Sequence, residues 1–250
     1  MKNIILVGSG NVATHLGIAL QNCNYKIVQV YSRSIENAKK LAQKLNTDFT
    51  NDLTQLKCAD LIIVSVKDDA ISSVLSKLKD TAIVHTSGSI GIDVFNKIHK
   101  NCGVFYPLQT FNKEISLDFS DIPLCIEANN PAFEDQLIAL ARNLSKTAIR
   151  INTEERQQLH IAAVFASNFS NQMFTIAANL LTKKNIDFSI LLPLIRQTVQ
   201  KLEDNSPKEI QTGPAQRNDI SIINEHLKAL EQTDVHELYA LISQNIMNKA

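Results

Sequence analysis

The first 150 residues alternate between two hydrophobic periods. Short apolar, β-branched runs occur at "NIILV", "KIVQVY", "LIIVSV", "AIVHT", "GVFY", "PLCIEA" and "TAIRI". Amphipathic stretches separate several of them, over residues 11–21, 35–45, 69–78 and 131–144. Strands that are apolar throughout are buried on both faces, and their alternation with helices is typical of a mainly parallel, doubly wound sheet. The pattern therefore predicts an α/β domain of the Rossmann type over residues 1–152.

The pattern changes after Thr153, where strand-like runs stop and glycine nearly disappears. A long helix is predicted from Thr153 to about residue 184, because glutamates in its first turn and lysines in its last suit the helix dipole. A second helix is expected to bend or restart at Pro193. These and two closing helices predict an all-α second domain over residues 153–250, with helices at 153–184, 187–204, 219–232 and 234–249.

Composition narrows the classes of function. Lysine plus arginine and aspartate plus glutamate each number 25, so the formal net charge is zero, and no basic block predicts a nucleic-acid or membrane partner. The four cysteines form no C-x-x-C pair, so neither a metal site nor a disulfide framework is predicted. No apolar run approaches the ~20 residues of a membrane helix, and the N-terminus does not read as a signal peptide. We expect a soluble cytoplasmic protein.

The first strand leads into a glycine loop that fits G-x-G-x-x-A. Its residues are Gly8, Ser9, Gly10, Asn11, Val12 and Ala13, and a predicted helix follows. Glycine permits the tight turn and the close approach of a pyrophosphate, whose charge the helix N-terminus stabilises. The strand–loop–helix context favours a dinucleotide site. A purely structural turn, or another nucleotide ligand, is the alternative.

The end of the second strand distinguishes between cofactors. NAD enzymes usually place Asp or Glu there to hold the ribose 2′-hydroxyl. This chain has Ser32, Arg33 and Ser34 instead, with no acid before Glu36. An arginine flanked by hydroxyls suits a 2′-phosphate, so NADP is favoured over NAD. The alternative is an ordinary solvated arginine after a strand.

Three further strand ends carry candidate groups, because ligands of parallel sheets lie beyond the carboxyl ends of the strands. Val66 and Lys67 follow one strand, His85 and Ser87 the next, and Tyr106 the one after that. We expect the first four to contact cofactor and Tyr106 to contact substrate. His85 could carry a proton, but a histidine that ends a buried strand is more often structural.

The long helix carries a polar stripe on a surface otherwise apolar enough to be largely buried. At about 100° per residue, Arg156, Ser167 and Asn171 fall within about 40° of His160, with Asn168 at the edge. The stripe either lines a cleft or forms a hydrogen-bonded seam, and both interpretations stay open. In "TGPAQRND", Gly213-Pro214 suggests a turn and residue 218 or 219 a helix cap. Arg217 there is a candidate anion contact.

The motifs "LVGSGNVATHLG", "VYSRS", "VHTSGS", "YPLQTF", "HIAAVFASNFSNQM" and "TGPAQRND" occur in this order over nearly the whole chain. In this the chain resembles a family of NADP oxidoreductases whose helical C-terminal domain has no assigned function. The family is similar to pyrroline-5-carboxylate reductases and to 6-phosphogluconate and β-hydroxyacid dehydrogenases. The resemblance implies NADP at Gly8, Gly10 and residues 32–34, a cleft between the domains, a 6-phosphogluconate-dehydrogenase-like helical domain and homodimers formed through that domain.

Two departures limit what the resemblance implies. The β-hydroxyacid dehydrogenases carry a catalytic lysine four residues before an asparagine on the long helix, but counting back from Asn168 gives Val164. Their acid–base mechanism therefore does not transfer. Many relatives have His-Pro where this chain has Tyr106-Pro107.

The sequence as a whole predicts an NADP-dependent oxidoreductase that transfers a hydride between NADP(H) and a small carbonyl, imine or hydroxy compound. His160, with a usual pKa of ~6.5, is the predicted general acid, and Ser87 and Asn168 complete the predicted catalytic set. Predicted substrate contacts are Asn171, Tyr106 and Arg217. One alternative is a non-catalytic NADP-binding regulator or scaffold, and another is a different nucleotide-dependent enzyme.

Overall fold

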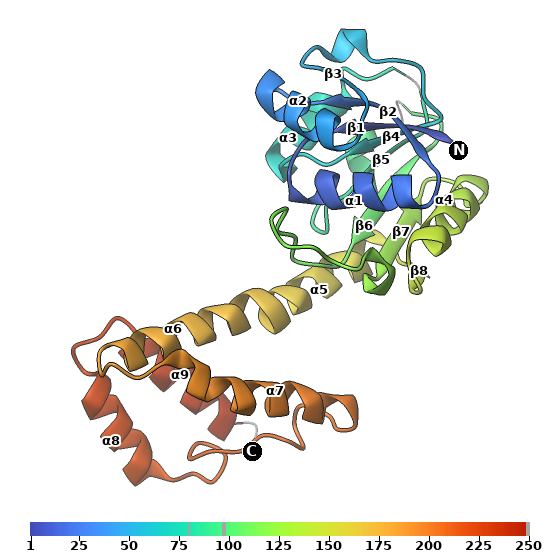
Figure 1. The fold of residues 1–250 in the computed structure, drawn as a ribbon. Coiled ribbons are helices and arrows are strands. Elements are labelled where there is room, and N and C mark those ends of the chain that lie inside the picture. The colour runs from blue at the N-terminus through green and yellow to red at the C-terminus, as the bar shows by residue number, and fades with distance from the viewer. Residues whose placement is uncertain (80, 97–98, 249–250) are drawn as a thin grey trace. The chain divides into compact units, whose positions relative to one another are not determined.

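The computed structural model describes residues 1–79, 81–96 and 99–248. The chain forms two compact units, residues 1–168 and 169–250 (Figure 1). The first unit thus includes the start of the long helix, which was predicted to belong to the second domain. The predicted division at 152/153 follows the change in sequence character, whereas the packing unit ends later because the N-terminal part of that helix contacts the sheet unit.

In the described part of the first unit, eight strands form one sheet in the order β3-β2-β1-β4-β5-β6-β7-β8. Neighbouring strands are parallel except β6 and β7, which are antiparallel. The mainly parallel Rossmann sheet is confirmed, and the short β3 was not predicted. The strands are β1 (Asn3–Val7), β2 (Lys26–Tyr31), β3 (Asp48–Thr50), β4 (Leu61–Val64), β5 (Ile83–His85), β6 (Cys102–Pro107), β7 (Leu124–Ala128) and β8 (Ala148–Arg150).

Helices cover both faces of this sheet, and β1 shows why. Ile4 and Leu6 lie in one hydrophobic cluster with side chains of three helices, while Ile5 and Val7 lie in another with side chains of a further helix and a 3₁₀ turn. Alternate side chains of a strand point to opposite faces, so a strand apolar throughout is buried on both sides. The helices are α1 (Asn11–Asn22), α2 (Ile35–Lys44), α3 (Asp68–Leu75) and α4 (Pro131–Leu144), with 3₁₀ turns η1 (Leu53–Gln55), η2 (Ile92–Phe95) and η3 (Phe119–Asp121).

The predicted long helix is not one continuous α-helix. It consists of α5 (Thr153–Ala163), a π-helical segment η4 (Val164–Phe169) and α6 (Ser170–Thr182). A capping box between Asn152 and Glu155 fixes its start. Because π-helical bonds run from i to i+5, the angular positions calculated across residues 160–171 do not hold, and the predicted single stripe is corrected.

The expectation that this helix is largely buried is also wrong for the single chain. Ile161 is 52% exposed and Phe165 is 64% exposed. Arg156, by contrast, is fully buried. The apolar composition of this helix therefore does not mean that its side chains are buried within one chain.

The second unit is helical, as predicted. Pro193 lies in the first turn of α7, directly after a 3₁₀ turn, so the expected restart at this proline is confirmed. Its remaining elements are η5 (Phe188–Leu191), α7 (Leu192–Gln200), η6 (Lys201–Glu203), α8 (Ile220–Leu230) and α9 (His236–Met247).

Candidate functional site

The glycine loop joins β1 to α1 with two glycines that serve different purposes. Gly8 has φ of +127°, and a Cβ there would lie 2.1 Å from the carbonyl oxygen of Ser65. The fold itself therefore requires this glycine. A Cβ on Gly10 would meet no described protein atom within 4 Å. No described protein atom therefore explains the glycine at position 10. A ligand that approaches the backbone closely at this position would explain it.

The N-terminus of α1 is open to an anion. Gly10 is the N-cap, so no side chain caps the helix, and the first turn contains no acidic residue. Unpaired N–H groups and the positive end of the helix dipole attract phosphate at such a position. Ser9 lies beside this helix start and donates a 2.9 Å hydrogen bond from its hydroxyl to Ser32, which ties the loop to the end of β2.

The two residues that follow Ser32 have different surroundings. Ser34 is the N-cap of α2, where its hydroxyl accepts from the Asn37 N–H and donates to Glu36. Arg33 lines a pocket instead. Of the predicted 2′-phosphate contacts, Ser32 and Arg33 line this pocket and the hydroxyl of Ser34 serves the helix cap.

The pocket has a volume of about 830 Å³ and lies where β1, β2 and β4 end. Seven predicted cofactor residues line it, namely Gly8, Ser9, Gly10, Ser32, Arg33, Val66 and Lys67. Its charged lining is predominantly basic, with Arg33, Lys40, Lys44, Lys67, Lys77 and Lys113 against Asp69 and Glu114. A basic cavity at the start of an uncapped helix suits a ligand that carries several phosphates.

Sequence reasoning missed several of these side chains. Asn37, Lys40 and Lys44 have the spacing of one helical face of α2, so the pattern could have suggested that they face the pocket together. Lys113 follows β6, far along the chain from the glycine loop, and no local sequence pattern indicates that it lines the pocket.

Asn11 and Val12 are absent from the pocket lining described above. The Asn11 amide donates a 2.8 Å hydrogen bond to the carbonyl of Phe111, and its oxygen accepts from the N–H of Lys113 at 3.4 Å. The side chain of Asn11 therefore holds a loop. The backbone N–H groups of both residues remain candidates for anion binding, because they belong to the first turn of α1.

A second cluster forms where α5 packs against the ends of β5 and β6. The hydroxyl of Tyr106 lies 3.0 Å from Nδ1 of His160, and the two rings meet edge to face. Burial raises the pKa of Tyr106 to about 12, so its hydroxyl is protonated near neutral pH. A Cβ on Gly88 would lie only 2.7 Å from His160 Nδ1, so the backbone of residue 88 packs directly against this pair.

The loop that carries Ser87 and Gly88 runs along α5. The side chain of Gln157 donates to the carbonyl of Ser89 at 2.7 Å, and the Arg156 guanidinium donates to the carbonyl of Ile90 at 2.9 Å. The Ser87 hydroxyl accepts from the N–H groups of Ser89 and Ile90. Ser87 thus shapes the turn that places Gly88 against the Tyr106–His160 pair.

Arg156 is a fully buried charge that pairs with an acidic side chain. Its Nη2 lies 3.0 Å from the carboxylate of Glu127, to which the Thr153 hydroxyl also donates. Burial lowers the pKa of Arg156, and the Glu127 carboxylate opposes that shift. This ion pair joins α5 to β7 and to the carbonyl of Ile90, so it is placed to hold the second cluster together.

His85 is fully buried, outside the pocket lining, and stacks on Phe95 at 5.6 Å. Its Nδ1 accepts from the N–H of Ser87. Burial, with the nearby charge of Arg156, lowers the pKa of His85 to about 3. A histidine that stays neutral near pH 7 does not exchange protons there, so this environment favours the structural interpretation of His85.

The remaining candidates lie elsewhere. Asn168 is exposed within the π-helical segment, and Asn171 is exposed on α6. Arg217 is exposed and lies 4.0 Å from Asp219, which is the N-cap position of α8 as predicted. The catalytic role of Asn168 and the substrate roles of Asn171 and Arg217 stay predictions.

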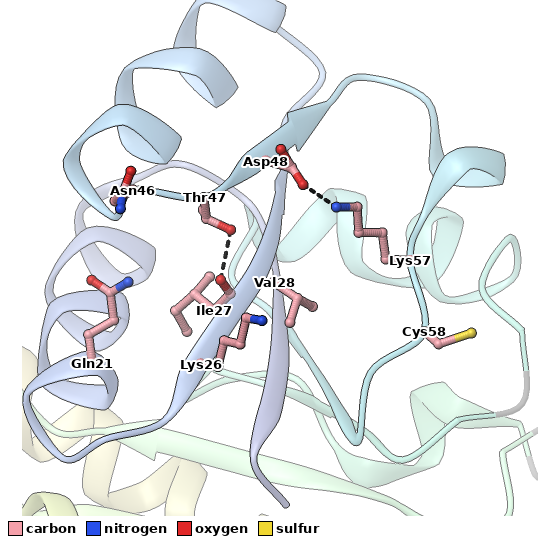
Figure 2. A pocket seen from close by; sticks show the side chains of 9 residues that line it. All are labelled: Gln21, Lys26, Ile27, Val28, Asn46, Thr47, Asp48, Lys57 and Cys58. Atoms are coloured by element: carbon pink, nitrogen blue, oxygen red, sulfur yellow. Dashed lines mark hydrogen bonds and ion pairs between the residues drawn. The ribbon is translucent and has the colours of Figure 1, made fainter.

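Another pocket, of about 500 Å³, lies at the opposite ends of the strands, where β2 and β3 begin (Figure 2). Several of its polar side chains already bond one another or the backbone, since the Thr47 hydroxyl donates to the Ile27 carbonyl and Lys57 pairs with Asp48. Lys26 lines it without an ion pair to any described residue. This region supplies a matched control for charge changes in the basic pocket.

The described residues contain no group of three or more His, Cys, Asp or Glu side chains that could hold a metal ion. Within the same residues, no helix has the length and apolar character needed to cross a membrane.

Strand order 3-2-1-4-5-6, a glycine loop and a basic pocket at the strand ends define the class of Rossmann dinucleotide-binding proteins. One family model, described as "NADP oxidoreductase coenzyme F420-dependent", matches residues 3–97, and another, "Domain of unknown function (DUF2520)", matches residues 122–246. A "putative NADP oxidoreductase" from Bacteroides fragilis is 41% identical, with 99% of this chain and 98% of that chain covered and a TM-score of 0.91. The chain therefore belongs to this NADP oxidoreductase family, with a DUF2520 region in its C-terminal part.

More distant structures agree in fold. A protein from Thermotoga maritima is 23% identical, with 98% of each chain covered and a TM-score of 0.80. A pyrroline-5-carboxylate reductase from Coxiella burnetii is 15% identical, with 99% of this chain and 97% of that chain covered and a TM-score of 0.61. No curated protein is a significant sequence match. The resemblance and the fold class expected from the sequence are confirmed.

Proposed function

We propose that the chain binds NADP(H) in the basic pocket and transfers a hydride between this cofactor and a small carbonyl, imine or hydroxy compound. The observation that carries the proposal is that one pocket contains both the uncapped start of α1 at Gly10 and the Arg33 side chain at the end of β2. The first suits a pyrophosphate and the second a 2′-phosphate.

The surroundings of Arg33 support NADP over NAD. The residues directly after β2 include no carboxylate to accept from a ribose 2′-hydroxyl, and the nearest acid, Glu36, accepts the Ser34 hydroxyl within the α2 cap. Lys40 and Lys44 add positive charge along the same side of the pocket. A 2′-phosphate therefore meets cations there and no opposing carboxylate at the strand end.

For the proton we propose His160. NADP(H), when bound, supplies the hydride chemistry, and the protein has to supply or accept the proton. The Tyr106 hydroxyl oxygen can accept from Nδ1–H of His160, so a protonated imidazole carries its second proton on Nε2 and is left with Nδ1–H once that proton is given up. Among the described residues no group bonds to Nε2. His160 is thus held in one orientation with its second nitrogen available for proton exchange.

The proposal includes a homodimer formed through the helical unit. Large apolar side chains are exposed there, including Ile190 at 67%, Leu194 at 61% and Leu241 at 69%. Exposed apolar surface of this kind favours association. Sedimentation of the protein at micromolar concentration tests this part, and a monomer would contradict it.

Calorimetric titration with NADPH and NADH tests the cofactor site. We expect NADPH to bind more tightly, and Arg33→Ala to weaken NADPH by roughly 10- to 100-fold with little effect on NADH, since a charge-assisted hydrogen bond contributes about 1.5–3 kcal/mol. Lys26→Ala removes the same charge beside the other pocket and should change neither affinity. Equal affinity for both dinucleotides would contradict the assignment of Arg33.

Turnover is measured separately, as loss of NADPH absorbance with a panel of small carbonyl and imine compounds. Tight NADPH binding without oxidation by any of them would favour the non-catalytic regulator. The absence of a lysine at position 164 is the observation that keeps that second candidate in the test.

A further inference from the structure

A segment that follows β6 by a few residues crosses the start of α1. We refer to residues 111–114 as the strap. Two side chains one turn apart on α1 hold it, because Asn11 bonds Phe111 and Lys113 while His15 Nε2 lies 2.9 Å from the carbonyl of Asn112. Three consecutive strap residues are therefore fixed to the helix that begins the cofactor loop.

The strap is also anchored in the core of the first unit. The ring of Phe111 stacks on Phe119 at 6.2 Å and lies 5.3 Å from the ring of His15. Phe111 is partly buried and packs against the hydrophobic cluster that contains Leu16 and Phe119. Apolar packing of this kind, together with the hydrogen bonds, gives the strap a defined position on α1.

The next residue along the strap reaches the cofactor pocket. Lys113 lines it together with Gly8, Ser9 and Gly10. Its backbone N–H bonds the side chain of Asn11, the first helical residue of α1, so Lys113 starts at the phosphate end of this helix. Among the described residues, no hydrogen bond or ion pair occupies the Lys113 ammonium.

We propose that Lys113 is a further pyrophosphate-binding residue, which the strap places opposite the N-terminus of α1. This inference rests on the proposed function and adds a ligand contact to the same site. The lysine stem lets a compact positive charge reach phosphate oxygens from a fixed backbone. The strap thereby supplies a cation on one side of the pyrophosphate, while the N–H groups of α1 face it from the other.

Glu114 provides an adjacent control of opposite charge. It lines the same pocket, and its N–H donates to the Asn112 side chain within the strap. A carboxylate near a pyrophosphate is unfavourable, so Glu114→Gln should leave dinucleotide affinity unchanged or raise it. Lys113→Gln should act in the opposite direction.

The test is calorimetric titration of the full chain with NADPH and NADH. Both carry the pyrophosphate, so we expect Lys113→Gln to raise the Kd for both by the same factor, about 5- to 20-fold. An unchanged Kd, or a loss confined to NADPH, would overturn the proposal. If the unaltered protein bound neither dinucleotide, the proposed function itself would fail, and that outcome is distinct from a selective failure of Lys113.

Asn11→Ala provides a second measurement. It removes the amide that holds the strap but leaves the backbone of α1 in place. We expect its effect on NADPH affinity to be non-additive with that of Lys113→Gln, because the two residues act through one contact. Additive effects would show that Asn11 does not act through Lys113. Melting temperatures of all variants establish that the fold is retained.

Discussion

The hydroxyl of Tyr106 lies 3.0 Å from Nδ1 of His160, and the backbone of Gly88 packs against both side chains. The three residues come from β6, from α5 and from the turn after β5. The arrangement fixes the imidazole through one nitrogen, which is what a general acid needs if it is to present the other to a substrate.

Replacing His160 tests its role as a proton carrier. Because general acid–base catalysis typically contributes 10²- to 10⁴-fold, we expect His160→Ala to lower kcat by at least about 100-fold with little change in NADPH affinity. Steady-state kinetics and calorimetry measure the two effects. His226 makes a similar contact with Tyr239 in the second unit, at 2.7 Å, so His226→Ala is the matched control and should retain turnover. A His160→Ala variant with less than a 10-fold loss would exclude the role.

Gly88→Ala should impair turnover through geometry. The added methyl group would lie 2.7 Å from His160 Nδ1 and 2.9 Å from Tyr106 Cζ, closer than real contacts allow. The pair must therefore move, and small displacements of a catalytic group cost much of its rate. We expect a fall in kcat larger than the change in NADPH affinity. Unaltered kcat would show that the position of His160 does not limit the reaction.

The two glycines of the cofactor loop should respond oppositely to alanine. Gly8→Ala places a Cβ against the Ser65 carbonyl at a positive φ, so we expect destabilisation by several kcal/mol. Gly10→Ala meets no described atom and has an extended backbone, so the melting temperature should hardly change while NADPH affinity falls. Thermal unfolding and calorimetry separate the two. Full NADPH affinity in Gly10→Ala would contradict a phosphate at this loop.

Removing either partner of the buried ion pair should destabilise the protein, but by different amounts. Glu127→Gln leaves the fully buried Arg156 guanidinium without a counter-charge, whereas Arg156→Met leaves a carboxylate that is 13% exposed. Removing one partner of a buried pair typically costs about 3–5 kcal/mol, and we expect Glu127→Gln to be the more damaging change. Urea unfolding measures the free energies. Arg150 pairs with Asp135 at the surface, so Asp135→Asn should cost at most about 1 kcal/mol.

His85 should make the fold sensitive to acid. Its pKa is lowered from 6.5 to about 3 in the folded protein, so below pH 6.5 the unfolded chain binds a proton that the folded protein does not. Stability is therefore lost as the pH falls from about 6.5 towards 3, by up to about 1.4 kcal/mol per pH unit. Urea unfolding of the unaltered protein and of His85→Phe at several pH values isolates this contribution, because other groups titrate in both. Parallel pH dependences would contradict it.

Sequence alone determined the features that depend on local pattern. The strands apolar throughout, the glycine loop and the acid-free end of β2 are contiguous stretches, so their chemistry can be read without knowing what lies across the sheet. The same holds for the restart of helix α7 at Pro193, which follows from the geometry of a single residue. These features predicted the Rossmann class and the helical second unit, whereas the family was inferred from a resemblance of motifs along the whole chain.

Tertiary structure decided which distant residues meet. The contact of Tyr106 with His160, the ion pair of Glu127 with Arg156 and the hold of Asn11 on the strap join residues 54, 29 and 100 positions apart. Such contacts depend on strand order and on the docking of α5, which hydrophobic periodicity does not encode. The π-helical segment at residues 164–169 likewise changed the angular positions calculated for an ideal helix. The places of His85, His160 and Lys113 in the molecule therefore follow from the long-range packing of the first unit, which the sequence pattern does not predict.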